Sequence, residues 1–499
     1  MVRPAPTVVG MSCTTLLIGK SASCSGATII ARNDDSGSGR YDPKRLVAVA
    51  PTDQPRHYRS TLSHVEIDLP DDPCRYTIAP NVLPNRGVLA EAGASERNVA
   101  MSATETIAVN ERVLAADPLV ELRPAEGVPG EAGYRPETPG GIGEEDIITL
   151  VLPYVSSARE GVERLGELLE RYGTYESNGV IISDVDEIWY VETIGGHHWI
   201  ARRVPDDCYA TIPNQLGIDD FDFSDAFGER RFFMCSADLR EFIDRHHLGR
   251  AMRPAQGAGF GVAAVLPDHI NPRAVFGTST VKDHIYNTPR AWYMQRHLNP
   301  SEDWDSPAAR YTPTSDDIPW CRAPENKVTV EDIDFLMSSH FEGTPFDPYG
   351  TLGTPESRHR YRPIGINRTG HMVAIELRHD VPAAAAAVMW IAFGSGPFTA
   401  VAPFSCERGR HSGVSARHHA RGLHRQPVLD EPSDRRNCRR ALVRDAQRDR
   451  ILWRAGAGVR APACRRNGCG ARRCRSRGHP RGAHGCERDD GRSSAGSDP

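Results

Sequence analysis

The sequence predicts an α+β fold whose strands pair antiparallel. Two short runs rich in β-branched residues, 13–20 and 28–30, flank a turn-forming segment, as is typical of a hairpin. Three further runs, 180–182, 188–191 and 198–201, are separated by turn residues and predict an antiparallel meander. Helical patterns occur elsewhere in the chain, so helices and sheets are both expected.

Three segments carry helix signals. Ser157 and Glu160 form a capping box ahead of apolar residues at helical spacing, and Gly173 supplies a stop signal. Segment 236–247 places its apolar residues on one helical face, and a helix capped by a threonine is expected over 329–340. These segments are expected to pack against the sheets.

Composition indicates a soluble globular protein with a sharp change near residue 405. The 499 residues are 39% hydrophobic and 25% charged. Residues 405–499 contain 23 Arg, no Lys and 10 acidic residues, so this tail is strongly basic while the body before it is acidic. An acidic body is a poor partner for nucleic acid. The apolar run 381–404 is broken by Gly and Pro, which favours buried strands over a membrane span.

The first twelve residues lack the apolar stretch of a secretory signal. The cysteines of the body match no disulfide or zinc pattern, which favours a reducing, cytoplasmic setting. These cysteines are Cys13, Cys24, Cys74, Cys208, Cys235 and Cys321. Segment 121–145 is rich in Pro, Gly and Glu and is expected to be a mobile loop that could act as a lid.

The predicted hairpin brings several reactive and charged side chains close together. It puts the thiol of Cys13 at the start of one strand and places Arg32, Asp34 and Asp35 at the end of the next. A thiol beside a guanidinium and carboxylates is a candidate nucleophilic centre, although a buried thiol or a structural ion pair is the simpler interpretation of each residue alone.

This arrangement resembles the N-terminal-nucleophile hydrolases, and within them the cysteine dipeptidases typified by dipeptidase A. Residues 100–106 read Ala-Met-Ser-Ala-Thr-Glu-Thr and residues 340–347 read His-Phe-Glu-Gly-Thr-Pro-Phe-Asp, both close to that family's segments. Segments 286–293, 361–366 and 388–394 are also similar. The resemblance implies a four-layer αββα sandwich with two antiparallel sheets, over residues 13–404.

The resemblance also implies site residues. Residues 1–12 would be a propeptide, and cleavage would make Cys13 the first residue and the nucleophile. Its own α-amine would act as the base, since the ordinary pKa values are about 8 for an α-amine and about 8.5 for a thiol. Arg32 would favour the thiolate and Asp35 would orient the amine. Asn214 would help to hold the oxyanion, and Arg290 would support the charge of the site. No cofactor or metal is expected.

One position departs from the family pattern. Ser95 stands where the family has an asparagine that is associated with the oxyanion hole, so its hydroxyl or a backbone N–H is expected to replace that donor. The adjacent His197 and His198 have no spaced partners, so they are expected to be strand-end residues and not metal ligands.

The function expected from the resemblance is hydrolysis of dipeptides. An acylase of non-peptide amides, such as penicillin V or bile-salt conjugates, would use the same catalytic residues, and a non-catalytic interaction protein like the secernins is a further alternative. Homo-oligomerisation is left open. For residues 405–499, the gain of Arg and Cys without Lys favours a frame-shifted reading over a natural disordered tail that binds nucleic acid.

Overall fold

A computed structural model gives the structure of the chain and describes residues 13–37, 43–83, 85–251, 266–394 and 399–406. The chain divides into units 1–442 and 443–499, and every described residue belongs to the first. The predicted propeptide 1–12 and nearly all of the basic tail lie outside the described residues.

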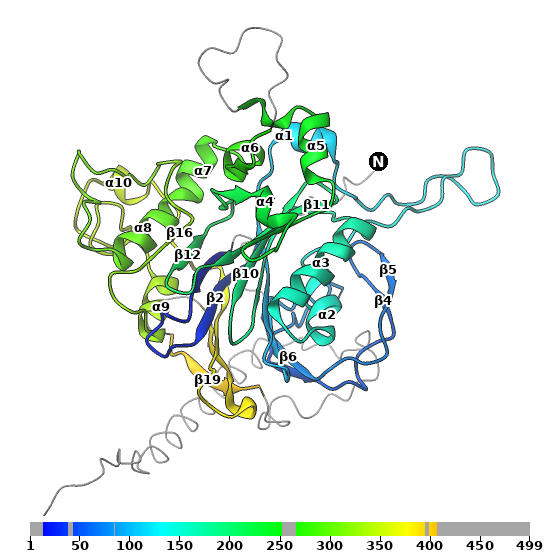
Figure 1. Cartoon of the computed structure of the whole chain (residues 1–499), viewed down its shortest axis with the longest axis horizontal. Helices are drawn as coiled ribbons and strands as arrows, with labels where there is room; N and C mark the ends of the chain where they lie inside the picture. The colour runs from blue at the N-terminus through cyan, green and yellow to red at the C-terminus, as the bar shows by residue number, and fades with distance from the viewer. Residues whose placement is uncertain (1–12, 38–42, 84, 252–265, 395–398, 407–499) are drawn as a thin grey trace, which may run out of the picture. The chain divides into compact units, whose positions relative to one another are not determined.

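The predicted N-terminal hairpin is confirmed and lies inside a seven-stranded sheet (Figure 1). β1 (Thr14–Ile18) and β2 (Thr28–Asp35) pair antiparallel, with Thr15 opposite Arg32. The strand order is β16-β12-β1-β2-β17-β18-β19. The other strands are β12 (Tyr209–Ile212), β16 (Cys321–Arg322), β17 (Thr369–Leu377), β18 (Ala387–Phe393) and β19 (Ala402–Ser405).

The predicted meander is also confirmed, within an eight-stranded antiparallel sheet. It consists of β9 (Asn178–Ser183), β10 (Ile188–Ile194) and β11 (His198–Val204). The full order is β14-β11-β10-β9-β8-β7-β6-β3. The remaining strands are β3 (Val47–Val49), β6 (Tyr76–Ile78), β7 (Ala92–Ser95), β8 (Ala100–Thr106) and β14 (Phe233–Cys235). Two small sheets join β4 (His57–Arg59) to β5 (Glu66–Asp68) and β13 (Phe221–Asp222) to β15 (His269–Ile270).

The three predicted helices form, with shorter bounds in two cases. α3 (Ala158–Tyr172) begins after Ser157, whose side chain accepts the Glu160 N–H, and ends at Gly173, whose φ of 69° suits glycine. α5 is Leu239–Arg245 and α9 is Val330–Ser338. The prediction that α9 continues to residue 340 is wrong, because its C-cap residue is already extended.

The remaining helices were not singled out by the sequence patterns above. They are α1 (Glu111–Ala116), α2 (Ile147–Val151), α4 (Phe223–Ala226), α6 (Pro272–Phe276), α7 (Val281–Tyr286), α8 (Thr288–Leu298) and α10 (Pro355–Arg358). Three 3₁₀ turns cover η1 (Leu152–Tyr154), η2 (Leu248–Ala251) and η3 (Ala383–Ala385). Among the described residues, no helix has the length and apolar character needed to cross a membrane.

Each large sheet is buried on both faces. Leu17 of β1 belongs to an apolar cluster that also contains Ile181 of the other sheet, so one face of β1 is directed toward the eight-stranded sheet. Leu16, one position earlier, belongs to a cluster with Trp292 of α8 and Leu336 of α9. A third cluster joins the eight-stranded sheet to α2 and α3, which lie on its other side (Figure 1). Because side chains alternate along β1, neighbouring residues of this strand are buried in two different apolar clusters.

The segment that was expected to be a lid has two distinct parts. Residues 121–139 are largely exposed and extend away from the sheets as a paired arm, with bridges between Arg123 and Thr138 and between Glu126 and Arg135 (Figure 1). Residues 140–145 return to the core and are buried. In the described structure the arm extends away from the sheets, and its use as a lid stays a prediction.

Glu192 of β10 makes a testable contribution to the pH dependence of stability. This fully buried carboxylate accepts the N–H groups of Gly217 and Ile218, and burial raises its pKa to about 7. The same group in the unfolded chain has its ordinary pKa of 4.5, so it releases its proton at lower pH there than in the folded state. The folded state should therefore lose stability as pH rises from about 4.5 to 7.

We expect Glu192→Gln to remove this dependence. As pH rises from 4.5 to 8, the free energy of unfolding of the variant should increase relative to that of the wild type. The change in this difference should be up to about 3 kcal/mol, at about 1.36 kcal/mol per pKa unit. Urea unfolding of both proteins at several pH values measures the difference. Parallel pH profiles would show that Glu192 is not the titrating group.

Candidate active site

The hairpin register brings Cys13 and Arg32 together. Side chains alternate along a strand, so Cys13 lies on the same face as Leu17, and Arg32 lies on the same face as Ile30. Both faces belong to the core between the two large sheets. Arg32 Nη2 donates to Cys13 Sγ at 2.7 Å, and neither residue is more than 1% exposed. The thiol therefore has a guanidinium as an immediate buried neighbour.

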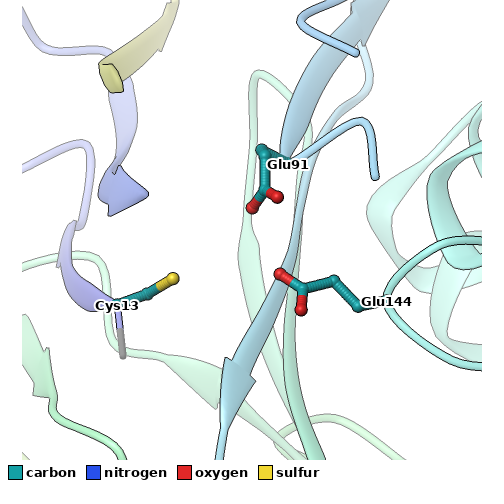
Figure 2. A group of neighbouring side chains, drawn as sticks. All are labelled: Cys13, Glu91 and Glu144. Atoms are coloured by element: carbon teal, nitrogen blue, oxygen red, sulfur yellow. The ribbon is translucent and has the colours of Figure 1, made fainter. Parts of the chain in front are cut away.

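Two carboxylates reach the same guanidinium from outside the hairpin. Glu91, just before β7, places Oε2 2.6 Å from Arg32 Nη2, and Glu144, just before α2, places Oε1 at 3.0 Å. Figure 2 shows both side chains directed toward Cys13. Glu91 has a φ of 61°, a left-handed conformation that costs a non-glycine residue free energy. Such strain is often found at functional sites.

Lys44 completes this buried group of charges. Its Nζ lies 2.8 Å from Glu91 and 3.4 Å from Asp34, which shares the face of Arg32 on β2. Burial acts to lower the pKa of Lys44, but the attraction of Asp34 and Glu91 outweighs it and raises the pKa overall. Burial also raises the pKa of Glu91, against the opposing attraction of Arg32.

A second arginine holds the backbone of the candidate nucleophile. Arg290 in α8 is fully buried, and its Nη1 donates to the Cys13 carbonyl and, at 2.6 Å, to Thr14 Oγ1. Its Nη2 donates to Asn214 Oδ1 at 2.8 Å and to Asn287 Oδ1 at 2.9 Å. Asn214 directly follows Pro213 at the end of β12, the strand paired with β1. Arg290 thus connects Asn214 to the start of β1.

Asp35 lies on the other face of β2. It is fully buried and forms an ion pair with Arg362 and a hydrogen bond with the Thr369 hydroxyl. Arg362 also donates to Thr14 Oγ1 at 3.3 Å. The alternation of a strand explains this placement, since Asp34 and Asp35 must point in opposite directions. Asp35 therefore approaches the start of β1 from the side of α8 and α9, and Arg32 approaches from the side of the other sheet.

Comparison with known proteins places this chain in a family. The chain matches peptidase family C69 over residues 12–417. It belongs to peptidase family C69. The positions of Cys13, Arg32, Asp35, Asn214 and Arg290 all lie within the matched range.

Relatives of this C69 family member carry dipeptidase names. A "Dipeptidase" of Bifidobacterium longum (strain NCC 2705) is 56% identical over 395 residues, which are 79% of this chain and 71% of that protein. A "Probable dipeptidase A" of Streptococcus pyogenes serotype M1 is 51% identical over 79% of this chain and 74% of its own length. "Dipeptidase A" of Lactobacillus helveticus is 45% identical over 79% and 74%.

A solved structure of a mutant conjugated bile acid hydrolase from Clostridium perfringens was also found. It is 12% identical, covers 51% of this chain and 66% of its own, and has a TM-score of 0.23. This likeness is too low to support an argument about the C69 chain.

Ser95 has a structural place in this C69 family member. It ends β7, and its Oγ accepts the Val99 N–H at 3.4 Å within the turn that leads to β8. Its carbonyl accepts the N–H of Asn98, a residue with the positive φ typical of such turns. These contacts explain why a small hydroxyl residue suits this position, and they assign the side chain to the turn.

The two histidines follow the same pattern of structural use. Asp117, after α1, accepts from both His197 and His198, and these contacts lower the pKa of Asp117 although burial acts to raise it. Both histidines stand where β11 begins, as the sequence indicated. Their hydrogen bonds to Asp117 hold the β10–β11 turn against the end of α1.

Sequence reasoning missed the carboxylates around Cys13. Glu91 lies four positions before Ser95 and Glu144 lies in the segment expected to be a loop, so no local pattern in the sequence marks either carboxylate as a site residue. Cys13 Sγ and one oxygen from each carboxylate lie within 4.8 Å of one another, a set that could ligate a metal ion. Arg32 Nη2 lies within 3.0 Å of all three groups, so a fixed cation already stands among them.

Proposed function

We propose that this chain is a cysteine dipeptidase that uses Cys13 as an N-terminal nucleophile after removal of residues 1–12. The observation that carries the proposal is the 2.7 Å contact between Cys13 Sγ and Arg32 in a fully buried, charged site. Membership of peptidase family C69 and the dipeptidase names of relatives at 45–56% identity support the choice of substrate.

In the proposed reaction the free α-amine of Cys13 takes the thiol proton, and Sγ forms a bond to the carbonyl carbon of the dipeptide. The peptide C–N bond then breaks, and the amine returns the proton to the leaving amino acid. Water next attacks the thioester with the amine as base, which releases the second amino acid and restores the thiol. No cofactor is required for this sequence of proton and acyl transfers.

The neighbouring residues suit this mechanism. Arg32 would stabilise the thiolate, because a cation beside a thiol favours its charged form. Asn214 has its Oδ1 occupied by Arg290, which fixes the orientation of its amide and directs Nδ2 elsewhere as an oxyanion donor. Asp35, itself held by Arg362 and Thr369, would orient the new amine from the face of β2 opposite Arg32.

We further propose that residues 13–404 form the four-layer αββα sandwich of the N-terminal-nucleophile hydrolases. The three apolar clusters support this order of layers: helices α8 and α9, the seven-stranded sheet, the eight-stranded sheet, then α2 and α3. Cytoplasmic location and the assignment of residues 405–499 to a frame-shifted tail stay predictions, and resequencing the gene around codon 405 tests the latter.

The function is tested by assaying the purified full chain with L-Ala-L-Ala and with penicillin V, together with the intact mass of the protein. We expect release of alanine, no cleavage of penicillin V, and a mass that begins at Cys13. Hydrolysis of penicillin V without hydrolysis of the dipeptide would favour an acylase. An active protein that still carries residues 1–12 would contradict the proposed nucleophile and base.

A further inference from the structure

The fold brings two thiols together at one edge of the seven-stranded sheet. β16 stands at the end of the strand order and pairs antiparallel with β12, with Ala210 opposite Cys321. Cys208 precedes Ala210 by two positions, and side chains two positions apart on a strand share a face. Ala210 belongs to the apolar cluster between the two large sheets, and Cys321 packs against that cluster. Cys208 and Cys321 are therefore diagonal neighbours on the same face.

The two thiols interact directly. Their side-chain hydrogen bond is the largest influence on the pKa of each, which it raises for Cys208 and lowers for Cys321. Burial opposes the effect on Cys321, and the nearby Arg202 supports it, since a cation favours a thiolate. Cys208 also donates to Asp207 Oδ1 at 3.6 Å. A thiol that releases its proton readily beside a second thiol is the arrangement from which a disulfide forms.

Closing a disulfide here requires only a small movement of the edge strand. Bonded cysteines usually have Cα atoms about 4.4–6.8 Å apart, and diagonal neighbours on paired strands are about 7–8 Å apart. β16 has two residues, and its shift toward β12 would disturb no further strand pairing among the described residues. Cys208 and Cys321 are both partly exposed, so an oxidant in the solvent can reach them.

We propose that Cys208 and Cys321 are a redox-active pair that a peroxide converts reversibly into an intrachain disulfide. The pair is separate from the candidate nucleophile. β1 pairs Thr15 with Ile212, the last residue of β12, so Cys13 lies toward that end of the strand. Cys208 comes just before the other end. The inference goes beyond the proposed dipeptidase function and does not depend on it.

The reaction with hydrogen peroxide balances in two steps. The Cys321 thiolate attacks one peroxide oxygen, the O–O bond breaks, and the products are a sulfenic acid and one water, which keeps the thiol proton. Cys208 then attacks the sulfenic sulfur, so that the S–S bond forms and the S–O bond breaks. The hydroxyl group leaves as a second water with the Cys208 proton. Two thiols are oxidised and the peroxide is reduced, and a reducing dithiol reverses the change by exchange.

The disulfide should stabilise the fold. It would join residues that are 113 positions apart, and this segment includes Asn214 and Arg290. A cross-link over a long loop restricts the unfolded chain more than the folded one. We therefore expect the oxidised protein to unfold at a higher urea concentration than the reduced protein.

The experiment treats the reduced full chain with hydrogen peroxide, alkylates the remaining thiols under denaturing conditions, and analyses a tryptic digest by mass spectrometry. The expected product is a linked pair of peptides that contains Cys208 and Cys321, at the summed mass less two hydrogens. Dithiothreitol should separate the two peptides. Oxidation to sulfinic acid without this linked pair, or a link between two copies of the chain, would overturn the proposal.

Variants separate this bond from general oxidation. Cys321→Ser should lose both the linked peptides and the rise in urea midpoint, whereas Cys24→Ala, which removes an exposed thiol outside the pair, should keep both. An equal rise of the midpoint in Cys321→Ser would show that another oxidation causes it and would contradict the inference. The digest of the wild type decides the result even if Cys321→Ser does not fold. Since no readout is an activity, failure of the dipeptidase assay leaves this test unaffected.

Discussion

Cys13→Ala is expected to abolish the release of alanine from L-Ala-L-Ala. The substitution removes the sulfur that contacts Arg32, so no acyl-enzyme can form at this position. The loss should be on the order of 10⁴-fold or more, because the nucleophile and its base act as a unit. Chromatographic measurement of free alanine over time checks this.

The control is Cys24→Ala. Cys24 is an exposed residue in the β1–β2 turn. Its thiol donates to the carbonyl of Lys327, which is not one of the charged residues around Cys13. We expect this variant to retain full activity. Residual hydrolysis by Cys13→Ala at more than about one thousandth of the wild-type rate would mean that another group performs the attack.

Replacement of Arg32 by methionine should harm both stability and reactivity. The guanidinium contacts Cys13, Glu91 and Glu144, and its removal takes a cation away from buried carboxylates. Breaking a buried ion pair from one side costs about 3–5 kcal/mol, so the urea midpoint should fall markedly. The Cys13 thiolate would also lose an adjacent cation, so alkylation of the folded protein by iodoacetamide at pH 7 should slow.

Arg135→Met serves as the matched control for Arg32→Met. Arg135 pairs with Glu126 in the exposed arm, and its side chain is 80% exposed. Exposed ion pairs contribute little, so the free energy of unfolding should change by less than about 1 kcal/mol. Similar losses in both variants would show that the buried cluster does not depend on Arg32.

The part of the site that the sequence predicted directly is the part that local structure determines. A hairpin of fixed register is enough to bring Cys13 beside Arg32, since Arg32 lies only 19 positions further along the chain. Arg290 and Asn214 were assigned by resemblance, and the structure brings both to the start of β1. No periodicity or spacing in the chain could have shown that a helix after residue 288 reaches this strand.

The remainder depends on how two sheets face each other. Glu91 and Glu144 enter from the eight-stranded side, and their approach to Cys13 follows from packing between layers, which no short motif records. Asp34 and Asp35 show a different limit. The sequence predicted both carboxylates near the thiol. Because side chains alternate along β2, Asp34 points toward Lys44 and Asp35 points toward Arg362 on the opposite face.

The route by which the chain assembles this site has a consequence for when activity can arise. β1 is synthesised first, yet its neighbours in the finished sheet include β12, and its first residues are held by Arg290 and Arg362. A growing polypeptide on the ribosome therefore has the thiol long before it has the groups that position it. If cleavage ahead of Cys13 requires those groups, each molecule would remain a zymogen until most of its body has been translated and folded.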